Sequence, residues 1–167
     1  MDPSQLSREL RTGDSADLNR RRWMIGLTFV GMVAAKAVSL YQMGMIKKLP
    51  DPPLPVFDST KVDASDYAYK RFNTPDGLMM LANFAATAWL VGAGGKNRAV
   101  RHPVLPVLLA GKAAGDALTA AKLTQEEWQE NKALCAYCQV AMLCSIATAA
   151  LAVPEAVRAV RFWQRKK

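Results

Sequence analysis

Histidine and cysteine are scarce in this chain of 167 residues, which has one histidine, His102, and three cysteines. A structural zinc site takes four ligands, usually Cys or His at short spacings, and this composition does not supply them, so we expect no metal site. Cys135 and Cys138 form a Cys-x-x-Cys pair, and because no histidine follows it, the pair is not a haem c attachment site. Thiol–disulfide exchange is left as the specific chemistry for these two residues.

Charge is almost missing from four long stretches of the sequence: residues 23–46, 78–95, 104–121 and 133–153. Only Lys36, Lys112 and Asp116 interrupt them. About 20 apolar residues cross the hydrocarbon layer of a bilayer as a helix, so each stretch is long enough, although the second and third are short for a span. The helices of a soluble bundle would carry a charged stripe, which these stretches lack. The pattern predicts an all-α membrane protein built as a four-transmembrane-helix bundle.

The distribution of Lys and Arg predicts the orientation of the bundle. Residues 1–22, 96–103 and 154–167 hold most of the Lys and Arg found outside the four stretches. Positive residues mark the cytoplasmic side, so we expect a multi-pass inner-membrane protein with both termini in the cytoplasm and an outer loop at residues 47–77. Residues 1–22 and 154–167 are then cytoplasmic tails around a membrane domain of residues 23–153. Their basic clusters meet anionic lipid, so the positive net charge requires no nucleic-acid partner.

The outer loop is rich in proline at its start and then carries four aromatic residues: Phe57, Tyr67, Tyr69 and Phe72. These side chains can lie on the bilayer interface or fold over the helix ends as a cap, and the sequence does not decide between the two. Between the third and fourth stretches, the segment from Thr124 to Glu127 has the form of a capping box. It predicts a fourth helix that begins outside the membrane and continues through Ala133 without a break.

The Cys-x-x-Cys pair lies near the start of the fourth stretch. Two residues one helical turn apart have Cα atoms about 5 Å from each other, a spacing that a disulfide tolerates. With the termini inside, the pair lies just below the outer surface, where a quinone dissolved in the bilayer and an extracytoplasmic thiol protein can both approach. Cys144 is about 9 Å further along the helix and is expected to be a small core residue. The alternative is a pair of incidental cysteines in a buried helix.

The three charged residues inside the stretches need partners or a purpose, because each costs roughly 2.5–3.5 kcal/mol to insert. In a functional interpretation, Asp116 takes or gives a proton during electron exchange, while Lys36 or Lys112 stabilises a thiolate or a quinol anion. In a structural interpretation, Asp116 pairs with Lys112 at the i,i+4 spacing or with Lys36 across helices, and the pair holds the bundle together.

Two short segments carry a resemblance to a known family. Residues 134–140, which include Cys135 and Cys138, and residues 38–41 at the end of the first stretch are similar to segments of the vitamin K epoxide reductase family. The resemblance covers roughly residues 23–155. It implies a bundle around a pocket for a quinone of the ubiquinone, menaquinone or vitamin K type, with Cys135 and Cys138 as the redox pair. In bacterial members, it implies a thioredoxin-like thiol protein as the partner.

The sequence departs from the family pattern at two places. Family members usually hold a second, relay cysteine pair in the first outer loop, and residues 47–77 contain no cysteine. Either the partner reacts directly with Cys135, expected as the more exposed thiol, or this branch does something else. The family pocket also often has a tyrosine where Met142 stands, and a thioether cannot donate a hydrogen bond to a quinone oxygen.

Further quinone contacts are expected only from their location near the start of the second stretch: Asp76, Leu78, Met79 and Asn83. Asn83 can equally be a polar contact between helices. The function predicted from these features is a membrane thiol–quinone oxidoreductase, in which Cys135 faces the partner and Cys138 faces the quinone. The alternative is a non-catalytic four-helix subunit or scaffold of a larger complex, which keeps the bundle without the relay cysteines.

Overall fold

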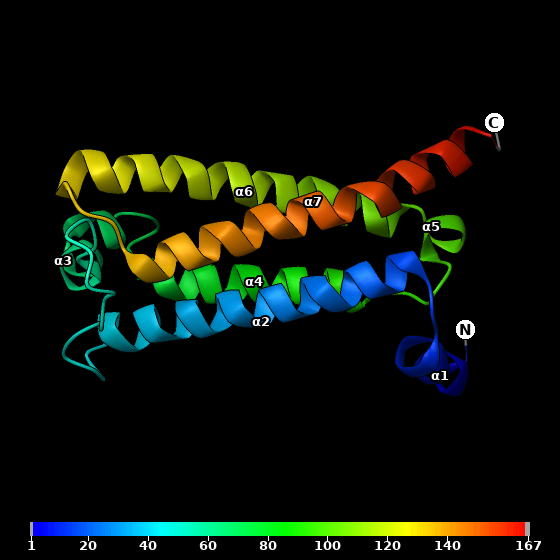
Figure 1. Cartoon of the computed structure of the whole chain (residues 1–167), viewed down its shortest axis with the longest axis horizontal. Coiled ribbons are helices and arrows are strands. Elements are labelled where there is room, and N and C mark those ends of the chain that lie inside the picture. The colour runs from blue at the N-terminus through cyan, green and yellow to red at the C-terminus, as the bar shows by residue number, and fades with distance from the viewer. Residues whose placement is uncertain (1, 166–167) are drawn as a thin grey trace.

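The computed structural model describes residues 2–165, and the described part is all helical apart from its loops. Four long helices run side by side along the molecule (Figure 1): α2 (Ala16–Gln42), α4 (Asp76–Gly92), α6 (Val104–Asn131) and α7 (Ala136–Gln164). The short elements α1 (Pro3–Thr12), α3 (Ser59–Ala64), η1 (Asp66–Ala68) and α5 (Arg98–Arg101) lie at the two ends of the bundle. Both chain termini are at the same end, and α3 is at the opposite end.

Three of these helices, α2, α6 and α7, are long and apolar enough to cross a membrane. Their outward surfaces expose large apolar side chains such as Trp23, Leu118 and Leu143, which are 72%, 74% and 61% exposed. Apolar side chains of this size on the outside of a bundle are typical of a surface that faces lipid. The chain is therefore a multi-pass membrane protein. The remaining long helix, α4, has 17 residues, and it remains a prediction that α4 is a further membrane span.

The long helices extend beyond the stretches that lack charge. Residues 1–22, expected as a tail, include α1 and the first two turns of α2, where the Ser15 side chain caps the helix by accepting a hydrogen bond from Leu18 N–H at 3.2 Å. At the other terminus α7 continues to Gln164, while Lys166 and Lys167 of the expected basic tail lie outside the described residues.

The expected unbroken helix from Thr124 through Ala133 is wrong. Thr124 and Glu127 lie inside α6, which continues to Asn131 because nothing in the sequence stops the helix after the third stretch. The helix ends at Lys132, whose left-handed φ of 53° breaks the backbone hydrogen-bond ladder. A new helix, α7, then begins at Ala136. Because of this break, α7 begins at the cysteine pair.

Close contact between α2 and α4 depends on two glycines. A Cβ atom at Gly31 would lie 2.4 Å from Cζ of Phe84, so only glycine admits that ring. At Gly77 a Cβ atom would lie 2.8 Å from the Ser39 nitrogen. The amide of Gln42 bridges the same contact by accepting from Gly77 N–H at 3.0 Å. The two glycines therefore fix the spacing of α2 and α4 along most of their length.

The segment between α2 and α4 folds over the end of the bundle opposite the termini (Figure 1), and its residues 49–71 are called the loop cap here. Its backbone pairs with the segment between α6 and α7. Leu134 N–H donates to the Val56 carbonyl at 2.9 Å, and Asp58 N–H donates to the Leu134 carbonyl at 3.1 Å. Leu49 of the loop cap is fully buried in a core cluster with the first cysteine of the pair. The loop cap is thus packed onto the start of α7.

The aromatic residues of the loop divide between the two expected roles. Tyr67 is 3% exposed, and its hydroxyl donates to the Leu123 carbonyl of α6 at 3.0 Å. Tyr69 donates to the Gln42 carbonyl at 3.3 Å. Both tyrosines therefore hold the loop cap on the helix ends, whereas Phe72 is 91% exposed, and its contact with a bilayer surface stays a prediction.

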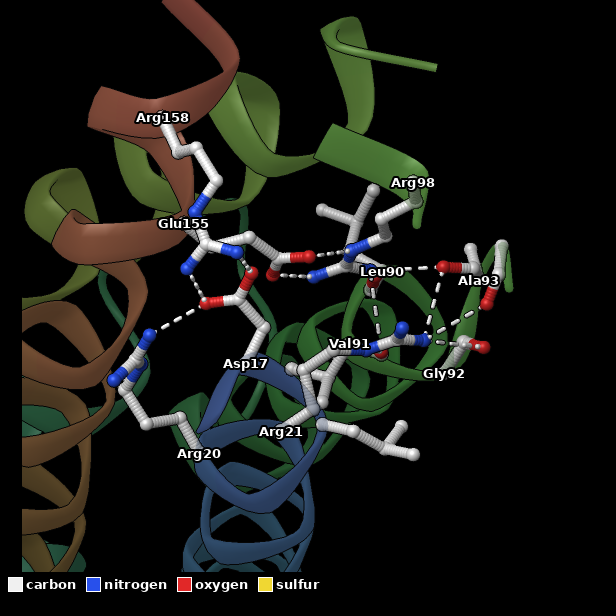
Figure 2. Close-up of polar contacts among 12 residues, drawn as sticks. Asp17, Arg20, Arg21, Leu90, Val91, Gly92, Ala93, Arg98, Glu155 and Arg158 are labelled. Carbon is white, nitrogen blue, oxygen red and sulfur yellow. Dashed lines mark hydrogen bonds and ion pairs between the residues drawn. The ribbon is translucent and has the colours of Figure 1, made fainter. Parts of the chain in front are cut away.

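The termini end of the bundle is joined by ion pairs of arginine side chains, among them the buried Arg98 (Figure 2). Arg98 lies next to α4 and forms a two-bond ion pair with Glu155 of α7, with distances of 2.9 Å from Nε to Oε1 and 2.7 Å from Nη2 to Oε2. Asp17 of α2 is bonded by Arg20 of its own helix and by Arg158 of α7. These charges connect α2, α5 and α7 where the helices would otherwise separate.

Arginine side chains also donate hydrogen bonds to the backbone carbonyls at the carboxyl end of α4. Arg21 of α2 donates to the carbonyls of Val91 at 2.8 Å and Gly92 at 3.1 Å, and Arg98 donates to those of Leu90 at 2.7 Å and Val91 at 3.2 Å (Figure 2). The last carbonyls of a helix have no partner within the helix and carry partial negative charge, so guanidinium groups stabilise them. The termini end of α4 is therefore fixed in position relative to α2.

Candidate functional site

The site is built around the first turn of α7. Cys135 is the N-cap residue of this helix, with extended backbone, and its Sγ accepts a hydrogen bond from Cys138 N–H at 3.2 Å. A sulfur at this position occupies the place that a serine or aspartate oxygen takes in ordinary caps, where the helix dipole favours negative charge. The break at Lys132 therefore places the pair at a helix amino terminus. All three cysteines are free thiols.

The exposures of the two thiols are the reverse of what was expected. Cys135, predicted as the more exposed thiol, is completely buried, whereas Cys138 is partly exposed. The loop cap explains the difference, because Ser59 Oγ accepts from Ala136 N–H at 2.8 Å and the Tyr137 hydroxyl donates to the Pro50 carbonyl at 2.8 Å. Both contacts hold the loop cap over Cys135. Cys144 is buried in the core as expected.

Two acidic residues that the sequence did not indicate lie beside the thiols. Asp63 of α3 is 1% exposed, and its carboxylate oxygen lies within 4.8 Å of both sulfur atoms. Glu127 of α6 is 3% exposed and accepts from Cys135 N–H at 3.3 Å through Oε2. Nothing in the local sequence distinguishes Asp63 from the other acids of the loop, and Glu127 was interpreted as part of a capping box. Packing of the loop cap and the extension of α6 bring them to the pair.

Burial is the main cause that raises the pKa of Asp63 to about 7, with smaller contributions from the nearby acids Asp76, Glu127 and Asp51, while the neighbouring Cys135 thiol acts in the opposite direction. At neutral pH this carboxyl group therefore exists in both its protonated and its ionised forms. A group of this kind can exchange a proton with a neighbour under physiological conditions.

A cavity of about 320 Å³ opens beside Cys138. Helices α4, α6 and α7 form its wall together with two residues of the loop cap, and its lining is mainly apolar: Tyr67, Arg71, Asp76, Met79, Met80, Asn83, Phe84, Asp116, Thr119, Ala120, Leu123, Thr124, Glu127, Cys138, Ala141, Met142 and Ser145. Small-molecule sites of roughly 300–1,000 Å³ are typically apolar with a few polar groups. The cavity fits that description.

The residues that the sequence suggested as quinone contacts or as charged groups of the site divide into two sets. Five of them line the cavity with Cys138: Asp76, Met79, Asn83, Asp116 and Met142. Leu78 is on the outer surface of α4, with 38% of its surface exposed, and Lys36 is exposed on the surface of α2; neither is among the lining residues.

The charged groups of the third stretch are paired. Lys112 Nζ donates to Asp116 Oδ2 at 2.6 Å, to Asn83 Oδ1 at 2.8 Å and to Thr87 Oγ1 at 2.7 Å. These contacts link α6 to α4, which agrees with the structural interpretation of the Lys112 and Asp116 pair and of Asn83 as a polar contact between helices. A proton-transfer role for Asp116 remains a prediction.

The position of Asp63 beside the two thiols also bears on metal binding. The Asp63 carboxylate and the two thiols are close enough to share a divalent ion, yet a structural zinc site takes four protein ligands. In the part of the chain that the structure describes, no fourth His, Cys, Asp or Glu joins these three. The arrangement suits thiol chemistry better than a closed metal site.

Comparison with known proteins then decides the family. The sequence model of the vitamin K epoxide reductase family matches residues 22–153, most of the chain and all of the site. The chain belongs to this family. No curated protein and no solved structure matches it. Members of the vitamin K epoxide reductase family are quinone-dependent thiol oxidoreductases, and the Cys-x-x-Cys pair of such an enzyme is present at Cys135 and Cys138.

The cavity residues fit the quinone that the family implies. The wall is mainly apolar, and the polar residues in it include Arg71, whose guanidinium carbon lies 4.7 Å from the centre of the Tyr67 ring. Its Nη2 bonds Glu126 at 2.8 Å, which holds the guanidinium in place. A quinone has an apolar ring and two carbonyl oxygens, so a mainly apolar wall with a few polar groups is suited to it.

Proposed function

We propose that the protein is a membrane thiol–quinone oxidoreductase that passes two electrons from a partner dithiol to a quinone through Cys135 and Cys138. The observation that supports this best is that Cys138 lies in the wall of the apolar cavity while its Sγ is next to that of the buried Cys135. A quinone in the cavity would therefore be adjacent to Cys138, and Cys138 would lie between the quinone and Cys135.

The reaction consists of two half-reactions, one with the partner dithiol and one with the quinone. In one half, a thiolate of the partner attacks the Cys135–Cys138 disulfide to give a mixed disulfide, and its second thiol releases the partner disulfide and the reduced pair. In the other half, the two thiols form their disulfide again and release two electrons and two protons, which convert quinone to quinol. Cys138 faces the quinone and Cys135 receives the partner.

Access to Cys135 requires the loop cap to move, because this thiol is completely buried. The contacts nearest to the pair that must be released are the pairing of Leu134 with Val56 and Asp58, and the bonds at Ala136 and Tyr137. A partner that binds the loop cap can supply the energy for this opening. The relay cysteines that other members carry in this loop are absent, so the partner thiol itself must reach the pair.

The location that follows from this proposal is the inner membrane, with four spans, both termini in the cytoplasm and the loop cap outside. The excess of Lys and Arg in the segments at the termini end supports that orientation. The partner is then a thioredoxin-like extracytoplasmic thiol protein. Arg71 and Asn83 are polar residues of the cavity lining and are our candidates to hold the quinone, Arg71 from the loop cap and Asn83 from the α4 wall.

The proposal is tested by measuring quinone reduction with the full chain in lipid nanodiscs, using dithiothreitol as the electron donor and a short-chain ubiquinone analogue as the acceptor. Replacing either Cys135 or Cys138 by serine should abolish turnover, because each thiol is half of the disulfide. Cys144→Ser is the matched control and should retain turnover, since Cys144 is separate from the pair. Quinone reduction that survives the loss of Cys135 and Cys138 would contradict the proposal.

A further inference from the structure

Asp63 is an unusual group in the centre of the loop cap. It is 1% exposed, and neither carboxylate oxygen receives a hydrogen bond from a nitrogen or oxygen donor in the described residues. A buried carboxylate without such donors is costly, because burial removes its hydration and nothing replaces it. A group of this kind is retained where its chemistry is used.

The thiol of Cys135 lies beside Asp63, with its Sγ within 4.8 Å of a carboxylate oxygen. The titratable groups around the carboxyl come from every element packed against it, and none of those that the structure identifies carries a positive charge: Asp51, Tyr69, Asp76, Glu127, Cys135, Tyr137 and Cys138. No cation therefore holds Asp63 in its ionised form. Burial raises the pKa of Asp63 to about 7, so the group can both accept and release a proton near neutral pH.

Glu127, the other acid at the pair, is engaged differently. Its Oε2 accepts from Cys135 N–H at 3.3 Å and from Gln139 Nε2 at 3.4 Å. These bonds connect Glu127 to the backbone and side chain of the first turn of α7, on the cavity side where Cys138 lies. Asp63 instead approaches from the loop cap and is not among the residues that line the cavity. Glu127 is thus engaged in hydrogen bonds at the start of α7, whereas Asp63 is left to act on a thiol.

We propose that Asp63 is the proton acceptor and donor of Cys135 in the thiol–quinone reaction. When the pair is oxidised, the Cys135 thiol transfers its proton to the Asp63 carboxylate, and the resulting thiolate forms the S–S bond with Cys138. The two electrons leave through Cys138 to the quinone, which takes up two protons, one from the Cys138 thiol and one passed on by Asp63, to become quinol. When the loop cap closes after a partner dithiol has opened the disulfide, Asp63 brings the Cys135 thiolate one of the two protons that the partner dithiol has given up.

This inference rests on the proposed function, and it also gives the loop cap a purpose. Asp63 is carried by α3, so opening of the loop cap for the partner removes the proton acceptor from Cys135, and closing returns it. The thiol is then deprotonated only when the loop cap is closed over the pair. Electron transfer to the quinone is in this way separated from exchange with the partner.

The test is a single-turnover measurement on the full chain in nanodiscs, reduced beforehand with dithiothreitol and freed of excess reductant. Mixing with the short-chain ubiquinone analogue gives the rate of quinone reduction, measured between pH 5 and 9. The wild-type rate should rise with pH through an ionisation near 7. Asp63→Asn should lower the rate at neutral pH roughly a hundredfold, the size expected for loss of a proton acceptor, and should remove the inflection.

Asp66→Asn is the matched control, because Asp66 is an exposed acid three residues further along the same loop. It should leave the rate and its pH profile unchanged. Asp63→Glu keeps the carboxyl group and should restore part of the rate together with an inflection, which a purely structural role would not require. Circular dichroism and the count of alkylatable thiols show whether each variant is folded.

The outcomes separate the two proposals. If wild-type protein reduces the quinone and folded Asp63→Asn does so at the same rate with the same pH profile, the role of Asp63 is overturned while the proposed function stands. If Asp63→Asn is slow but keeps the wild-type inflection, Asp63 acts structurally and the inference is again overturned. If the reduced wild-type pair does not react with quinone at all, the proposed function itself fails.

Discussion

Loss of the Arg98 guanidinium should strongly destabilise the fold, because it leaves a buried carboxylate without a counter-ion. The side chains of Arg98 and Glu155 are 0% and 3% exposed, and their paired bonds of 2.9 and 2.7 Å account for both oxygens of Glu155. In Arg98→Ala these oxygens would be buried without a positive partner. Breaking a buried ion pair on one side typically costs about 3–5 kcal/mol. For a chain of this size, this corresponds to a fall in melting temperature of roughly 6–20 °C.

The double replacement Arg98→Met with Glu155→Leu separates the cost of an unpaired charge from the loss of side-chain contacts. Replacing a whole buried pair by apolar residues is often close to neutral. The carbonyl of Val91 keeps a bond from Arg21 in the double variant, whereas that of Leu90 loses its bond from Arg98. The double variant should therefore recover most, but not all, of the lost stability.

The assay is thermal unfolding in nanodiscs at a fixed scan rate, followed by circular dichroism. Lys122→Ala is the control, because Lys122 is 75% exposed and lies 3.7 Å from Glu126, and its loss should cost less than about 1 kcal/mol. If the Arg98→Ala and Lys122→Ala proteins have the same melting temperature, the view that the buried Arg98 stabilises the termini end is refuted.

Three further predictions concern packing, quinone binding and pH. Gly31→Val should lower the free energy of unfolding by about 1–3 kcal/mol in a chemical denaturation experiment, because its side chain would enter the space of the Phe84 ring. Arg71→Met should raise the KM for the ubiquinone analogue about tenfold, from the loss of one hydrogen bond worth roughly 1.5 kcal/mol, whereas Lys70→Met at the adjacent exposed position should leave KM unchanged. The free energy of unfolding of the wild type should fall as pH rises from 3.8 to about 7, since folding favours protonated Asp63, and Asp63→Asn should make that fall smaller. An equal fall in Asp63→Asn would show that other groups cause it.

The helical bundle could be predicted from the sequence because charge exclusion is a local signal. Long runs without charge mark helices that meet lipid, and they identified α2, α6 and α7 as well as the shorter α4. The ends of the helices were less predictable. The break between α6 and α7 occurs at Lys132, a residue with no intrinsic preference for the left-handed conformation that it adopts.

The Cys-x-x-Cys pair was evident in the sequence, but its surroundings were not. Asp63 looks like any other acid of a polar loop, and its burial beside Cys135 comes from the way in which the loop cap packs on α7. The same packing buries Cys135, which reversed the expected exposure of the two thiols. Arg98 and Glu155 meet across 57 residues of chain, and no local pattern connects them. Contacts of this kind depend on the tertiary arrangement.

The most direct test of the account is to determine the bond between Cys135 and Cys138 as the quinone pool changes. The full chain in nanodiscs is equilibrated with the oxidised or the reduced ubiquinone analogue, its free thiols are alkylated, and the pair is examined by mass spectrometry. The account predicts a Cys135–Cys138 disulfide with quinone and two alkylated thiols with dithiothreitol and quinol, while Cys144 stays a free thiol throughout. A pair that remains reduced in excess quinone would contradict it and would favour a non-catalytic subunit.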